Sequence, residues 1–77
     1  MNVALVLDAR APLLTRGDFI FVYFRKGAHL GSTPWNGELV LAKVIARHGV
    51  LRRGADHVQI RANTLDGPLI WEERHTL

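Results

Sequence analysis

The fold is decided by residues 6–22, which read VLDARAPLLTRGDFIFV. Apolar runs at both ends of this stretch predict two strands, because valine, isoleucine and phenylalanine favour the extended backbone. Between the runs, Pro12 disfavours a helical conformation at the residue before it, and Gly17 can adopt a positive φ in a tight turn. The stretch therefore predicts a strand, an irregular turn and a second strand.

The length of 77 residues predicts one small domain spanning residues 1–77. The chain has no cysteine, so no disulfide or thiolate cluster can stabilise it. Its composition is 48% hydrophobic and 22% charged, which is rich enough in apolar residues for a core and argues against disorder. Stability is therefore expected to come from apolar burial or from a partner chain.

The net charge of +3 favours contact with phosphate or with an acidic protein surface, although the excess is modest. The longest apolar runs, Val3–Leu7 and Phe19–Phe24, are far too short to span a bilayer. The opening residues lack the cationic flank of a secretory signal. We expect a soluble, cytoplasmic protein with no membrane partner.

Turn residues separate short apolar segments along the chain, a pattern typical of a small all-β barrel or coiled sheet. No window has a helix-period apolar face long enough to predict a helix. The predicted strands are Val3–Leu7, Phe19–Phe24, Glu38–Ala46, Val50–Arg53, Val58–Ala62 and Leu69–Glu73. The predicted turns and loops are Asp8–Leu14, Thr15–Asp18, Arg25–Gly37, Arg47–Gly49, Gly54–His57 and Asn63–Pro68.

Two of the predicted strands have informative side-chain patterns. Every residue of Phe19–Phe24 is aromatic or β-branched, so both faces of this strand are expected to be covered. Residues 58–62 alternate, which places Val58, Ile60 and Ala62 toward the core and leaves Gln59 and Arg61 on the other face.

Several short patterns resemble the LexA and signal-peptidase-like serine peptidases. In that family a strand leads into Asp-Ser-Met-x-Pro, and Gly-Asp with an apolar strand follows; here Asp8, Pro12, Gly17 and Asp18 fall at those places. Residues 37–43, GELVLAK, resemble the family's Gly-x-apolar-Val-x-Ala pattern. Later strands of the family are matched by residues 50–53, 58–63 and 68–70. The resemblance implies a coiled-sheet or SH3-like barrel over nearly the whole chain.

The resemblance also implies that the chain is not an enzyme. The family's chemistry needs a serine hydroxyl beside a lysine with a lowered pKa. Ala9 stands at the serine position and Leu51 at the best match for the lysine. If the register slips by one residue, Arg52 cannot serve as a base because its guanidinium stays protonated. We expect no catalytic residue and no cofactor.

What remains of the family's properties is association. LexA-like repressors pair through exposed strands near the C-terminus, so the resemblance implies a homodimer, or pairing with a LexA-like transcriptional repressor. The candidate partner-binding residues are Trp35, Ile70 and Trp71. Trp35 can be an interface anchor on an exposed loop or a lid that folds over the core, and both interpretations stay open here.

The alternative function is a basic SH3-like barrel that binds nucleic acid. Arginine and lysine side chains occur at predicted strand ends and turns, where a barrel could bring them to one face. The candidate residues are Arg25, Lys26, Arg47, Arg52 and Arg53. Tyr23 and Trp35 could then offer stacking surfaces beside them.

Other reactive residue types show no site pattern. Ser32 has no Gly-x-Ser-x-Gly context, and it is expected to be a turn residue. Asp18 is expected to accept hydrogen bonds from turn amides. The four histidines have no metal-ligand spacing, so we expect exposed turn histidines and no metal site; they are His29, His48, His57 and His75.

Overall fold

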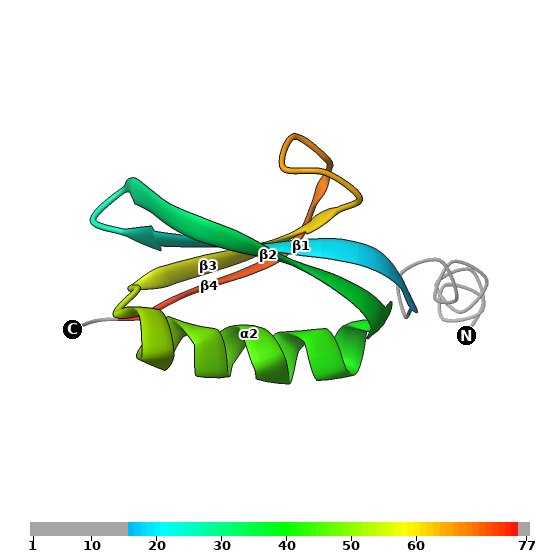
Figure 1. Cartoon of the computed structure of the whole chain (residues 1–77), viewed down its shortest axis with the longest axis horizontal. Coiled ribbons are helices and arrows are strands. Elements are labelled where there is room, and N and C mark those ends of the chain that lie inside the picture. The colour runs from blue at the N-terminus through cyan, green and yellow to red at the C-terminus, as the bar shows by residue number, and fades with distance from the viewer. Residues whose placement is uncertain (1–15, 76–77) are drawn as a thin grey trace, which may run out of the picture.

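A computed structural model describes residues 16–75 as a four-stranded sheet with one helix (Figure 1). The helix lies along one face of the sheet, and the other face carries no helix in this part of the chain. In chain order the elements are β1 (Arg16–Arg25), β2 (Ala28–Glu38), α2 (Leu39–Arg53), β3 (His57–Ala62) and β4 (Leu69–Arg74). The predicted strand Val3–Leu7 and turn Asp8–Leu14 fall outside the described residues.

The strand order in the sheet is β2-β1-β3-β4, and every neighbouring pair is antiparallel. The two central strands are therefore β1 and β3, while β2 and β4 form the edges. Helix α2 connects β2 to β3, so it has to cross the sheet past the intervening strand β1. This crossing is what holds the helix against the middle of the sheet.

The core lies between α2 and the helix-facing rows of the central strands. From β1 it receives Phe19, Phe21 and Tyr23, which face small residues of the helix. The helix contributes Ala42, Ala46 and Val50 to the same cluster. Its remaining members are Ala55, which follows the helix, and Val58 and Ile60 of β3. Because bulky strand residues meet alanines, the helix can approach the sheet closely.

Helix α2 ends in a Schellman motif. Gly54 has φ 66° and ψ 30°, the left-handed conformation that glycine adopts without steric cost. Its amide and that of Ala55 donate to the carbonyl oxygens of Leu51 and Val50 at 3.4 and 2.9 Å. The basic last turn, Arg52 and Arg53, complements the negative end of the helix dipole.

The mostly antiparallel β character is confirmed, but the prediction that no helix forms is wrong. Helix α2 includes the residues predicted to form the strands Glu38–Ala46 and Val50–Arg53 and the turn Arg47–Gly49. The one exception is Glu38, which directly precedes the helix. Apolar residues surround this helix on all sides, so its sequence lacks the amphipathic period by which a helix is recognised. Its β-branched residues favour an extended backbone, so the sequence predicts a strand instead.

Two predicted irregular segments are also wrong. The predicted loop Arg25–Gly37 contains most of β2, and residues 16–18 of the predicted turn begin β1. Both form strand because they pair with each other, from Arg16 opposite Glu38 to Arg25 opposite Ala28. Pro34 is accommodated because β2 is an edge strand, where a missing donor costs no ladder bond.

The strongest strand predictions are confirmed. Residues 19–24, 58–62 and 69–73 all lie in strands, and residues 63–68 connect two of them. Val58 and Ile60 are fully buried on the helix side, whereas Gln59 and Arg61 lie on the other face, as their alternation predicts. Val22, on that other face, is also buried.

Gly49 should tolerate no side chain, although it lies inside a helix. A Cβ there would lie 2.9 Å from Cε1 of the buried Tyr23 and closer still to its Cζ and Oη. We expect Gly49→Ala to destabilise the fold by about 1–3 kcal/mol through overpacking, opposite in sign to the gain of about 1 kcal/mol usual for this change in a helix. Urea unfolding measures it. Gly17→Ala, whose Cβ would meet Phe19 at an ordinary 3.7 Å, is the control, and a stabilised Gly49→Ala would contradict the packing.

Candidate functional site

The side of α2 that faces away from the sheet carries a row of exposed, mostly apolar residues. We call Leu41, Val44, His48 and Leu51 the outer stripe. Their spacing places them opposite Ala42, Ala46 and Val50, which face the sheet. Leu51 is 81% exposed, Leu41 51% and Val44 42%. Contiguous exposed leucine and valine on one helix face are typical of an interaction surface.

Three of the four arginine and lysine side chains of α2 contact strands of the sheet. On the β4 side, Arg47 donates to the Glu73 carboxylate at 3.0 Å and lies 5.3 Å from the Trp71 ring centroid. Lys43 lies over the same ring at 6.0 Å. Arg53 donates to Thr33 Oγ1 at 2.8 Å on the β2 side. These contacts leave the outer stripe without a formal charge.

A basic end of the molecule forms where the C-terminus of α2 meets the β1–β2 turn. Arg25 Nη1 donates to Gly54 O at 2.7 Å, and Lys26 N donates to the Asp56 carboxylate at 2.9 Å. The Arg53 guanidinium lies 4.7 Å from the Tyr23 ring centroid. Burial raises the pKa of the Tyr23 phenol, while the charges of Arg53 and Arg52 partly offset that rise. The basic end thus comprises Arg25, Lys26, Arg52 and Arg53.

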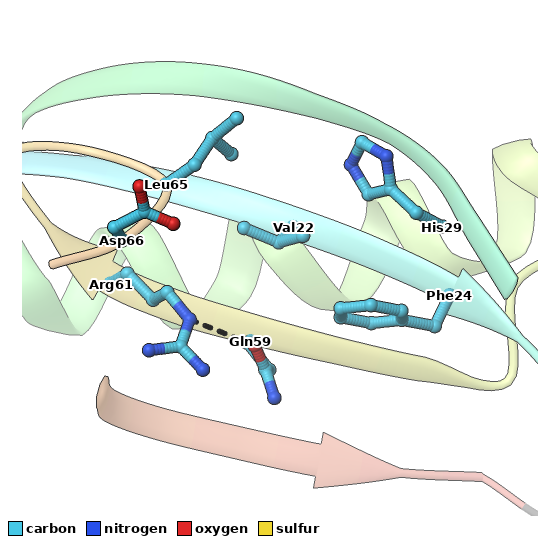
Figure 2. Close-up of a pocket in the computed structure, with 7 residues that line it drawn as sticks. All are labelled: Val22, Phe24, His29, Gln59, Arg61, Leu65 and Asp66. Carbon is cyan, nitrogen blue, oxygen red and sulfur yellow. Dashed lines mark hydrogen bonds between the residues drawn. The ribbon is translucent and has the colours of Figure 1, made fainter. Parts of the chain in front are cut away.

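The opposite face of the sheet holds a hollow of about 410 Å³ (Figure 2). Val22 and Phe24 of β1 form its floor, with Gln59 and Arg61 of β3 on one side and His29 of β2 on the other. The β3–β4 loop contributes the remaining lining residues, Leu65 and Asp66. Arg61 Nε donates to Gln59 Oε1 at 3.0 Å and its Nη1 donates to Gly67 O at 2.9 Å.

An aromatic row borders this hollow. Phe24 stacks on His57 with ring centroids 5.1 Å apart, and it meets His29 edge-on at 5.9 Å. His57 is buried, and its Nε2 lies 2.6 Å from Glu72 Oε1. This hydrogen bond lowers the pKa of the Glu72 carboxyl, with a smaller contribution from the charge of Arg74. The Phe24 ring therefore rests on a partner that is itself held in place.

The structure brings together four of the five predicted nucleic-acid residues. Arg25, Lys26, Arg52 and Arg53 meet at the basic end, whereas Arg47 is paired with Glu73 near β4. The predicted stacking residue Tyr23 is buried in the core, so it offers no surface to a base. This part of the prediction is wrong.

The predicted partner-binding residues lie on two edge strands. Trp35 packs against the core, with its ring stacked 6.0 Å from Phe21, which is the lid arrangement. Trp71 lies under Lys43 and Arg47 on the helix side, and Ile70 also packs against the core. None of the three belongs to the outer stripe, which the sequence analysis did not find.

The remaining predicted positions are scattered. Ala9 lies outside the described residues, and Leu51 is the most exposed of the apolar residues of the outer stripe. Ser32 is on β2, and the Asp18 carboxylate accepts from the Asn36 side chain rather than from a turn amide. His57 contradicts the expectation of exposed turn histidines because it is buried in a strand. Within residues 16–75, no three metal-ligating side chains gather.

Comparison of the chain with protein-family models, with curated proteins and with solved structures finds no match. The LexA-like resemblance therefore stays a prediction. Of residues 37–43, which carry part of that resemblance, residues 39–43 lie in α2. No helix among the described residues is long and apolar enough to cross a membrane.

The His57–Glu72 pair should make stability depend on pH in the acid range. The pKa of Glu72 is lowered in the folded state from an ordinary value of 4.5. The stabilisation is therefore present above pH 4.5, and it is lost as the pH falls through the folded-state pKa, where both states hold the proton. We expect Glu72→Gln to lower the thermal midpoint near neutral pH and to match the unchanged protein in strong acid.

Thermal unfolding followed by circular dichroism across the acid range measures this convergence. Asp66→Asn is the control, because it removes an exposed carboxylate that makes no ion pair within residues 16–75. A Glu72→Gln midpoint that stays below the unchanged protein by a constant interval at every pH would contradict a role for the charged carboxylate.

Proposed function

We propose that this chain functions by protein association, as a homodimer in which the outer stripes of two α2 helices pack against each other. The observation that supports it is the exposed apolar row formed by Leu41, Val44 and Leu51. Burying a leucine side chain contributes about 1.5–3 kcal/mol, so a helix that exposes several such residues gains by covering them.

The spacing of the outer stripe suits a second helix. Leu41, Val44, His48 and Leu51 follow each other at intervals of three, four and three residues, which is the seam pattern of paired helices. This pattern is symmetric about its centre. In an antiparallel pair, Leu41 faces the partner's Leu51, and Val44 faces the partner's His48. A second copy of the chain is thus complementary to the stripe.

The charges next to the stripe favour the antiparallel arrangement. Residues 39–53 contain basic residues and no acid, while Glu38 precedes the first turn. Two antiparallel helices bring Glu38 near the partner's Arg52, which has opposite charge. The helix dipoles also oppose each other favourably in this arrangement. A parallel pair would instead place both basic C-terminal turns side by side.

Association through strand edges, as implied by the LexA-like resemblance, has less support. The edge strand β4 exposes Glu72 and Arg74, and charges on an edge discourage pairing with another strand. Pairing with a LexA-like transcriptional repressor stays an alternative partner for the outer stripe. The expectation that the chain is not an enzyme remains part of the proposal.

Leu51→Gln should dissociate the dimer without unfolding the chain. The side chain is 81% exposed, so it contributes little to the folded protomer. A symmetric interface loses two leucines, and about 3 kcal/mol for the pair corresponds to an affinity roughly 100-fold lower. Sedimentation equilibrium measures the dissociation constant. Leu30→Gln, on β2 and 44% exposed, is the matched control and should leave it unchanged.

A charge exchange tests the antiparallel register. Glu38→Arg and Arg52→Glu should each weaken the dimer several-fold, because each single change sets like charges against each other. The double variant should recover most of the lost affinity. A chain that stays monomeric up to about 0.5 mM would overturn the homodimer. A double variant weaker than both single ones would overturn the register.

A further inference from the structure

We propose that the open face of the sheet binds single-stranded nucleic acid, with one base seated in the hollow against Phe24. This face lies on the other side of the sheet from α2, so the inference does not rest on the proposed dimer. The hollow, the aromatic row and the basic end each contribute a separate part of the recognition.

The aromatic row offers a preformed stacking surface. Phe24 is only half-buried, and its ring is supported by His57, which is buried and held by Glu72. His29 is exposed beside it at the rim of the hollow, as Figure 2 shows. A base that stacks on an aromatic side chain contributes about 1–3 kcal/mol. The supporting ring reduces the ordering cost of this contact.

The polar side chains of the hollow suit the edge of a base. Arg61 donates to two neutral acceptors, Gln59 Oε1 and Gly67 O, and within residues 16–75 no carboxylate forms an ion pair with it. It can still donate through Nη2 to a ring nitrogen or a carbonyl oxygen of a base. Asp66, at the same hollow, can accept from an exocyclic amine. A base that carries both an acceptor for Arg61 and an exocyclic amine for Asp66 matches these two side chains.

The Asp66 carboxylate also decides which part of a nucleotide the hollow can accept. A negative charge in the hollow repels phosphate, so the hollow suits the base and not the backbone of a nucleotide. The backbone is attracted instead to the basic end, since Arg25 and Lys26 follow Phe24 directly in the chain. A ligand that spans both places has to join a planar base to phosphate, as a single strand does.

A duplex cannot use this face in the same way. The base has to present its ring to Phe24 and its edge to Arg61 and Asp66, and in a duplex its faces are stacked and its pairing edge is occupied. The surface therefore predicts a preference for single strands. It also predicts a preference for cytosine over thymine, because only cytosine has the exocyclic amine that Asp66 can accept from.

Fluorescence anisotropy with end-labelled oligo(dC) and oligo(dT) of equal length tests the proposal on the full chain. We expect oligo(dC) to bind several-fold more tightly, and binding to weaken as salt rises. His29→Ala and Arg61→Gln should each lower the affinity for oligo(dC) at least about fivefold. Arg16→Gln is the matched control for Arg61→Gln. It also removes one positive charge, but Arg16 is exposed at the start of β1, whereas the basic end lies at the other end of this strand.

Asp66→Ala separates base recognition from general charge attraction. It removes a negative charge, so attraction alone predicts tighter binding of both oligonucleotides, whereas the proposed contact predicts that the preference for cytosine disappears. A duplex that binds as tightly as the single strand would overturn the proposal. Free dCMP that competes at the affinity of the oligonucleotide would show a nucleotide site instead and would overturn the single-strand assignment. Equal weakening by Arg16→Gln and Arg61→Gln would overturn the role of the hollow.

Discussion

The structure depends on the fit between the buried aromatic side chains of β1 and the small residues of α2. Phe21 and Tyr23 are almost fully buried under a helix whose facing residues include Ala42, Ala46 and Gly49. Large side chains on the strand fill the space that alanine and glycine leave on the helix, so the two elements pack closely. Gly49 matters most, because Tyr23 occupies the volume that any side chain there would need.

This fit decides how the helix is oriented and hence which residues it exposes. Turning Ala42, Ala46 and Val50 toward the sheet leaves Leu41, Val44 and Leu51 directed away from it. Lys43 and Arg47 then lie over Trp71, so the cations flank the apolar row instead of interrupting it. The proposed dimer surface is thus a consequence of core packing: small residues inside leave the larger ones outside.

The same arrangement frees the other face of the sheet. One helix covers one face, and on the other face the β3–β4 loop meets β1 and β3 around the hollow at Val22 and Phe24. Antiparallel pairing sets Phe24 opposite His57 and Val22 opposite Gln59, so residues far apart in the sequence become neighbours. The proposed base-binding hollow and the outer stripe therefore lie on opposite sides of one small domain.

The sequence by itself determined the strands whose side-chain patterns favour an extended backbone alone. Residues 19–24 are all aromatic or β-branched, and residues 58–62 alternate, so local propensity and burial agree on an extended backbone. It also determined the abundance of basic residues, four of which meet at one end of the molecule. For residues 39–53, by contrast, local preferences conflict, because valine and isoleucine alternate with good helix formers such as alanine, leucine and arginine.

Tertiary structure decided the helix, the edge strand β2 and both proposed surfaces. A glycine after two arginines at residues 52–54 indicates the end of a helix. The surface against which Ala42 and Ala46 pack, however, forms only when β1 and β3 are paired. The strand β2, with its glycines and Pro34, is extended because β1 supplies its hydrogen-bond partners. The hollow depends on cross-strand register in the same way. A sequence specifies each residue's own preferences, whereas these features depend on contacts between residues that only folding brings together.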